Sequence, residues 1–252
     1  MPQDDHDITH SGGLTRLFID APLSQGRTVP LAEAQTHFLA HVMRAKPGDG
    51  LRVFNGRDGE WRAIVSEIAK RAVTLKIEAQ TRKQAGVPDL WLLLAPIKKI
   101  PLDYIVRKAT ELGVARIQPV FTRRTIVDRV NAERMRANAI EAAEQSGRLT
   151  VPEVVEPVDL AKLIPQWSAD RKLMFCDEGG EAPPAVAALA KVGAGPWAIL
   201  TGPEGGFDPA EREMLRRLSF VVPVSLGPRI MRADTAALAA IALWQSTLGD
   251  WN

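Results

Sequence analysis

The chain has 252 residues, 46% of them hydrophobic, and 32 Lys and Arg against 30 Asp and Glu give a formal charge of +2. This composition excludes extensive disorder, collagen and coiled coil, and the length predicts one large domain or two smaller ones. A single cysteine excludes an internal disulfide and a zinc site of clustered cysteines, and it favours the reducing cytoplasm. The longest uncharged run, 235–249, is too short and polar to span a membrane, and the acidic N-terminus is unlike a signal peptide.

The first third of the chain predicts a disordered tail, residues 1–13, and then a small β-rich domain, residues 14–83. Runs of β-branched and aromatic residues follow one another, and a loop rich in glycine and aspartate joins two of them. Pro30 is expected to open a helix over residues 31–44. Strands this short with a single helix predict a small barrel or sandwich. The strands are expected at 51–55, 60–68 and 72–81, after an apolar stretch at 16–19, and the buried face of the helix would carry Leu31, Ala34, Phe38 and Val42.

Residues 88–252, beyond a polar linker, alternate between apolar strands and helices, which predicts an open α/β sheet. In the second half of this domain Asp208, Pro209 and Glu211 have the spacing of a capping box at a helix start. Asp234 or Thr235 would cap the last helix. Strands are expected at 90–95, 114–121, 173–176, 197–200 and 220–226, and helices at 101–113, 133–147, from 209 and at 235–245.

Loops that follow the strands are the expected ligand site, because α/β sheets bind ligands beyond the carboxyl ends of their strands. The loop TGPEGGF (201–207) matches neither the Walker A nor the dinucleotide-binding pattern. Glu211 and Glu213 in the following turn would repel a phosphate, so a ligand without phosphate is favoured. Alternatively, the glycines only turn the chain. The other two candidate loops are CDEGG (176–180) and LGPRIMRADTA (226–236).

Basic residues are in excess in one stretch of the second domain. From Lys98 to Arg136 there are ten basic and four acidic residues, a surplus of six, which favours contact with a phosphate backbone over a simple solvated face. Arg229 and Arg232, beside a Gly-Pro turn, are a further possible anion or RNA contact. No metal site is expected, because the pair His37 and His41 has no third ligand nearby.

Six segments together resemble one family. RLF, HFLAHVMRAKPGD, IVRKATELGV, EAAEQSGR, LTGPEGGF and LGPRIMRADTAALAA are similar to segments of the ribosomal RNA small-subunit methyltransferase E family, the 16S rRNA uridine N3-methyltransferases of the SPOUT superfamily. The similarity runs from about Arg16 to the last helix. Met231 stands where the family usually has leucine, and Ala233 and Asp234 stand where it often has Thr-Glu, which weakens a catalytic role for that acid.

The resemblance implies a PUA-like β-barrel at the N-terminus and a SPOUT-type α/β domain with a trefoil knot. It also implies a homodimer acting on 16S rRNA of the small ribosomal subunit, with S-adenosylmethionine held in a bent form by the knot loops. Cys176 and Glu178 are weaker candidates for the rim around its adenosine. By position, the cofactor contacts would be Leu200, Thr201, Gly202, Pro203, Glu204, Gly205, Ser225, Leu226, Gly227, Ile230, Met231, Arg232 and Thr235.

A mechanism follows as a hypothesis from the chemistry of N3, which must lose its proton before it can accept a methyl group. Arg232 is the candidate that stabilises the developing uracil anion, and Glu204 or Asp234 is the candidate proton acceptor. The residues expected to grip the RNA backbone are Arg16, Arg44, Lys98, Arg123 and Arg124.

Two alternatives stay open. The first is a SPOUT methyltransferase that modifies another RNA position, such as a ribose 2′-hydroxyl, because the knot loops do not name the acceptor atom. The second is a non-catalytic RNA-binding protein of ribosome assembly, although such a protein would have no reason to keep both knot loops.

Overall fold

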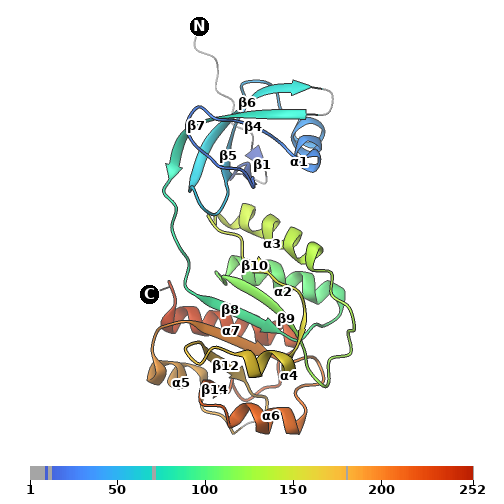
Figure 1. Ribbon diagram of the computed structural model, residues 1–252, viewed down its shortest axis with the longest axis vertical. Coiled ribbons are helices and arrows are strands. Elements are labelled where there is room, and N and C mark those ends of the chain that lie inside the picture. Colours follow the sequence, from blue (N-terminus) through green and yellow to red (C-terminus); the bar gives the residue numbers. More distant parts are fainter. Residues whose placement is uncertain (1–8, 11–12, 70–71, 180, 252) are drawn as a thin grey trace. The chain divides into compact units, whose positions relative to one another are not determined.

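The computed structural model describes residues 9–10, 13–69, 72–179 and 181–251 (Figure 1). The chain forms two compact units. The first contains the described residues up to Gly86 together with Ala143–Thr150, and the second contains Val87–Ala142 and the chain from Val151 onward. The segment Ala143–Thr150 therefore joins the first unit, whereas the sequence assigned it to the second domain. The expected tail, 1–13, lies mostly outside the described residues.

The first unit is built on a five-stranded sheet with the order β3-β5-β6-β7-β4. Among the described residues of this sheet, β3 and β5 pair in parallel, and the other pairs are antiparallel. Alternate residues of the three long strands, among them Val53, Val65 and Leu75, face one core and are fully buried. The elements of this unit are β1 (Thr9–His10), β2 (Gly13–Leu14), β3 (Arg16–Phe18), β4 (Thr28–Pro30), α1 (Glu33–His37), the π-helix η1 (Phe38–Val42), β5 (Gly50–Phe54), β6 (Glu60–Ala69) and β7 (Ala72–Arg82).

The predicted helix of this unit is wrong in its start and in its buried face. Pro30 ends the edge strand β4, and α1 begins only at Glu33. The continuation is a π-helix in which Met43 N donates to Phe38 O at 2.9 Å. A π turn inserts an extra residue into the helical repeat and so rotates the apolar face. Leu39 is buried, while Ala34 and Val42 are exposed.

The second unit is built on a seven-stranded sheet in which every pair of described neighbouring strands is parallel, and helices flank it (Figure 1). The strand order is β10-β9-β8-β13-β12-β14, and β11 also pairs with β9. The elements are β8 (Leu90–Leu94), α2 (Lys99–Glu111), β9 (Arg116–Phe121), α3 (Ala132–Ser146), β10 (Glu153–Val154), β11 (Val158–Asp159), α4 (Leu160–Leu163), the 3-10 helix η2 (Ile164–Gln166), β12 (Lys172–Cys176), α5 (Ala185–Val192), β13 (Trp197–Thr201), α6 (Pro209–Arg216), β14 (Val221–Val224) and α7 (Ala233–Leu248).

Both faces of this sheet are buried, which explains the uninterrupted apolar runs in its strands. Leu92 and Leu94 face the core formed with α2, α3, α5 and α7, while Leu93 faces the core formed with α4 and α6. The five long strands match the predicted α/β sheet. The short β10 and β11 and the helices α4 and α5 had no predicted counterpart. The trefoil knot is not tested by the strand order and stays a prediction.

The start of the last helix also differs from the prediction. Helix α7 begins at Ala233, so Asp234 and Thr235 lie inside its first turn and neither caps it. The Asp234 carboxylate instead accepts the N–H of Thr235 at 2.8 Å. No helix among the described residues is long and apolar enough to cross a membrane.

Candidate functional site

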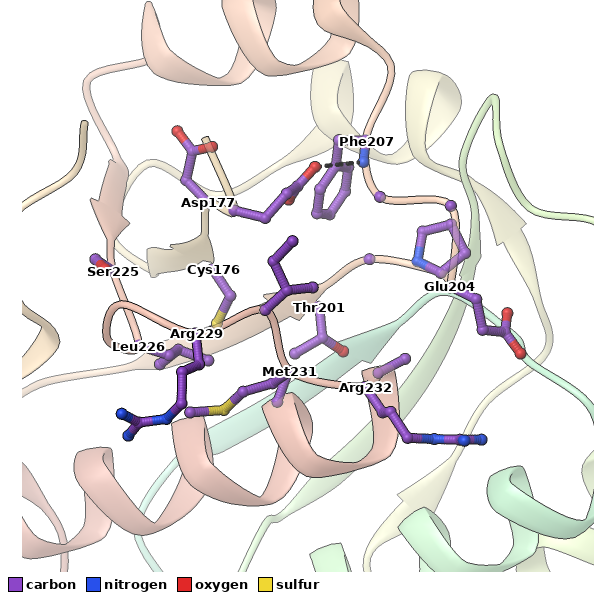
Figure 2. A pocket seen from close by; sticks show the side chains of 18 of the residues that line it. Cys176, Asp177, Thr201, Glu204, Phe207, Ser225, Leu226, Arg229, Met231 and Arg232 are labelled. Carbon is purple, nitrogen blue, oxygen red and sulfur yellow. Dashed lines mark hydrogen bonds between the residues drawn. The ribbon is translucent and has the colours of Figure 1, made fainter. Parts of the chain in front are cut away.

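A cavity of about 1130 Å³ opens at the carboxyl ends of β12, β13 and β14 in the second unit. Three loops form most of its wall (Figure 2): the residues that follow β12, the glycine-rich loop after β13, and the loop between β14 and α7. These are the three loops that the sequence singled out, and the sheet order brings them together because β12 lies between β13 and β14. Ile97, Pro101, Arg124 and Pro184, together with Pro209 and Arg212 of α6, also line the cavity.

The loop after β13 is held by packing of its last residue, Phe207. This side chain is 2% exposed and meets the ring of Phe175 edge to face, with centroids 4.9 Å apart. A Cβ at Gly202 would lie 2.8 Å from the Phe207 ring, so only glycine fits there. Gly206 has φ +66 and donates its N–H to Pro203 O at 2.9 Å, which closes the turn.

The helix that follows this loop has the predicted capping box. The Asp208 carboxylate accepts the N–H of Ala210 at 3.0 Å, and Glu211 accepts the N–H of Asp208. The bond from Ala210, followed by the bond and charge of Arg123, lowers the pKa of Asp208. Since these carboxylates already occupy the N-terminus of α6, its free amides are not available to a phosphate. The cavity is therefore suited to a ligand without phosphate.

The loop between β14 and α7 contributes two of the four arginines that line the cavity. Figure 2 shows Arg229 and Arg232 extending to opposite sides, with Arg232 and Glu204 on the same side of the view. The Arg232 side chain is 80% exposed, and its Nε lies 3.8 Å from a carboxylate oxygen of Asp234. All three residues predicted to act in catalysis, Glu204, Arg232 and Asp234, line the cavity.

The loop after β12 contains the charged groups that sequence reasoning underrated. The buried carboxylate of Asp177 forms ion pairs with Arg212 and Arg216 of α6, and its hydrogen bond raises the pKa of Arg216. Burial, and then the charge of Glu178, raises the pKa of the Cys176 thiol to about 12. Cys176 is thus a neutral, apolar part of the wall. The only sequence signal for Asp177 was its place directly after a buried strand.

Eleven of the thirteen predicted cofactor contacts line the cavity, and the two that do not are Leu200 and Thr235. Leu200 is fully buried in the core under the sheet, and Thr235 lies exposed in the first turn of α7. Cofactor contact by any of these residues stays a prediction. Lining residues that lie outside the three candidate loops and were not predicted individually are Ile97, Pro101, Pro184, Pro209, Arg212 and Val224.

Four of the five residues predicted to hold RNA are exposed: Arg44, Lys98, Arg123 and Arg124. Arg124 also donates to Gly205 O at 3.2 Å and so lies at the cavity wall. Arg123 is 64% exposed although its guanidinium pairs with Asp208 at 3.1 Å. The RNA contact of these residues stays a prediction.

Arg16 differs from the others because its side chain is only 12% exposed within the first unit. Its Nε donates to Glu60 at 2.8 Å, and its Nη atoms donate to the carbonyls of Ala143, Glu144 and Arg148. These carbonyls include the unpaired ones at the end of α3. The guanidinium thus acts as a helix cap, a role that the sequence did not indicate.

No group of three or more His, Cys, Asp or Glu among the described residues could hold a metal ion. The site therefore consists of backbone groups, apolar side chains, carboxylates and arginines. A cavity lined by four carboxylates and four arginines suits a ligand with charged and polar groups along its length.

Comparisons with known proteins agree with this chemistry. Residues 84–245 match the family described as an RNA methyltransferase domain, and residues 31–78 match the RNA methyltransferase PUA domain. The chain is 33% identical over 229 residues to the ribosomal RNA small subunit methyltransferase E of Rickettsia conorii, covering 90% of this chain and 93% of that protein. Its counterpart in Synechocystis is 34% identical over 85% of this chain and 72% of that protein.

Solved structures give the same result. A methyltransferase from Legionella pneumophila in complex with S-adenosylmethionine superposes with a TM-score of 0.85 at 27% identity, covering 94% of this chain and 98% of that one. The ribosomal RNA small subunit methyltransferase E from Neisseria gonorrhoeae bound to S-adenosylmethionine superposes with a TM-score of 0.81 at 28% identity, and the match covers 94% of this chain and 99% of that one. The fold of both units is thus that of SPOUT methyltransferases with a PUA-like domain, as expected from the sequence.

Proposed function

This chain belongs to the ribosomal RNA small subunit methyltransferase E family, and we propose that it transfers a methyl group from S-adenosylmethionine to N3 of a specific uridine in 16S rRNA. The observation that carries this proposal is the cavity at the carboxyl ends of β12, β13 and β14, which both glycine loops line. The N-terminus of α6 beside this cavity is capped and acidic, which disfavours a phosphate ligand. S-adenosylmethionine is a cation without phosphate and avoids this repulsion.

The bound cofactor supplies a methyl group on a positively charged sulfur, and the chain has to align and activate the acceptor. When the N3–C bond forms and the C–S bond breaks, the N3 proton must go to a base. Glu204 is our choice for that base, because its carboxylate is exposed at the cavity wall. Asp234 already accepts the N–H of Thr235 and lies beside Arg232, so it serves better to orient that guanidinium.

Arg232 has the position and charge to stabilise the uracil oxygens as negative charge develops on them. Its side chain is 80% exposed, and its ion pair among the described residues is the long contact of 3.8 Å to Asp234, so it has room to close over a bound base. The base has to leave the RNA stack to reach the cavity, as enzymes that modify bases generally require. Arg123, Arg124 and Lys98 would hold the backbone nearby.

The homodimer is part of the same proposal. Large apolar side chains are exposed on the second unit: Ile100 and Tyr104 on α2 are 81% and 42% exposed, and Ile230 at the cavity is 98% exposed. Exposed apolar surface of this kind is typical of a surface that a partner covers. Light scattering on the purified protein, with a mass of two chains expected, tests this point. We also propose that the protein acts in the cytoplasm, where its single buried cysteine would stay reduced.

The decisive experiment maps methylated nucleosides by mass spectrometry in ribosomal RNA from cells that lack this protein, and again after its restoration. Loss and return of 3-methyluridine in 16S rRNA is the expected result. Loss of a 2′-O-methylated nucleoside instead would favour the alternative acceptor. If no methyl group is lost and calorimetry detects no binding of S-adenosylmethionine, the protein is a non-catalytic RNA-binding factor and the proposal is overturned.

A further inference from the structure

The loop after β12 is fastened to α6 by a buried carboxylate. Asp177 has a side chain with no exposed surface, and burial of a lone charge costs several kcal/mol. One oxygen accepts from Arg212 Nε and from Gly179 N, both at 3.0 Å. The other accepts from Arg216 Nε at 2.7 Å. Because the two arginines are one turn apart on α6, the loop has a fixed position on that helix.

The next residue, Glu178, joins this loop to the glycine-rich loop. Its Oε1 accepts the backbone N–H of Phe207 at 2.8 Å, the contact drawn as a dashed line in Figure 2. Phe207 is the last residue of the glycine-rich loop and directly precedes the helix cap Asp208. This bond therefore fastens the main chain of one cavity wall to a side chain of another.

The contact between Glu178 and the glycine-rich loop depends on glycine at two positions. A Cβ on Gly206 would lie 2.6 Å from Glu178 Oε1, and a Cβ on Gly179 would overlap the Arg212 guanidinium. Glycine at both positions lets the carboxylate and the arginine approach the main chain closely. Glu178, Gly206 and Phe207 all line the cavity, so a shift in this contact changes the cavity wall.

We propose that Glu178 is a positioning residue, which holds the glycine-rich loop through the N–H of Phe207 and so preforms the cofactor cavity. The identity of the ligand rests on the proposed function, but the effect on the loop does not. Asp177 holds the segment that carries Glu178, and α6 supplies the fixed frame. Glu178 acts through the backbone of another loop and takes no part in proton transfer.

The test compares Glu178→Ala with Glu178→Gln, because glutamine keeps an oxygen that accepts the N–H of Phe207. The matched control is Glu181→Ala, which removes a 79% exposed carboxylate that is paired with Arg216 and lies outside the cavity lining. Calorimetry measures the affinity for S-adenosylmethionine, and hydrogen exchange measures the protection of residues 202–208 in the free protein. The thermal midpoint shows whether the fold is intact.

For Glu178→Ala, the loss of one charge-assisted hydrogen bond is expected to weaken binding about tenfold and to speed exchange at residues 202–208. Glu178→Gln and Glu181→Ala are expected to remain within about twofold of the wild type. If hydrogen exchange at residues 202–208 is unchanged in Glu178→Ala, the positioning role is overturned. Equal losses of affinity in Glu178→Ala and Glu178→Gln, without faster exchange at these residues, would also overturn it. If the wild type itself fails to bind the cofactor, the proposed function falls, while the exchange result still decides the positioning role.

Discussion

Replacing Asp177 by asparagine removes one negative charge from a site where two arginines converge. The wild-type carboxylate is fully buried, and each of its oxygens accepts from a different guanidinium. Asparagine is nearly isosteric, so the substitution leaves no cavity. It offers one acceptor instead of two and turns its amide N–H groups toward a guanidinium. The arginines of α6 then lose the charge that holds them against the loop.

The expected loss of unfolding free energy depends on the solvent exposure of the two arginines that pair with Asp177. Breaking a buried ion pair costs about 3–5 kcal/mol when the remaining charge cannot reach water. Arg212 and Arg216 are 23% and 28% exposed, so both can recover part of their hydration. We therefore expect a loss of about 2–3 kcal/mol of unfolding free energy, since each bond to a charged group is worth about 1.5–3 kcal/mol. For a domain of this size that corresponds to a fall of about 5–10 °C in Tm.

Tryptophan fluorescence during thermal unfolding is a suitable assay, because five of the six tryptophans lie in the second unit. The control is Asp170→Asn at an exposed position, for which a change within about 0.5 kcal/mol is expected. An Asp177→Asn protein that melts with the control would refute the argument. Its arginines would then be stabilised by water rather than by the buried carboxylate.

Four further outcomes are expected. Arg232→Ala should lower kcat about 100-fold at saturating S-adenosylmethionine, with partial recovery in Arg232→Lys; full turnover with normal cofactor affinity would exclude the assigned role. Cys176, with a pKa of about 12, should react with a thiol reagent at pH 8 about 1000-fold more slowly in the native than in the denatured protein, and equal rates would contradict the burial. Because that pKa is raised above the unfolded value of 9.0, its contribution to stability is present below pH 9 and is lost as the pH rises toward 12. Arg16→Ala should lower the free energy of unfolding by about 3 kcal/mol and speed hydrogen exchange in residues 143–150. Unchanged exchange in that segment would show that the guanidinium does not cap α3.

Local patterns predicted the second unit well. A strand buried on both faces is apolar at every position, and a capping box needs only residues close in sequence, so both β8 and the start of α6 were recognisable. The helix after Pro30 was not, because η1 departs from the regular helical repeat on which the face assignment relied. The caps proposed for α7 failed for a similar reason, since its first residue comes earlier than the side chains suggested.

Local sequence patterns indicated the composition of the site: two glycine-rich loops, a helix start closed to phosphate, and an excess of basic residues in one stretch. Which of those residues contact one another follows from the fold. Parallel strands that are neighbours in the sheet are far apart along the chain, so the meeting of Asp177 with Arg216 could not be read from spacing. The same holds for Arg16, whose three carbonyl partners lie more than 120 residues away in the sequence and give its guanidinium the role of a helix cap. The charge of a side chain can be read from the sequence. Its binding partner, and therefore its role, depends on burial and distances in the fold.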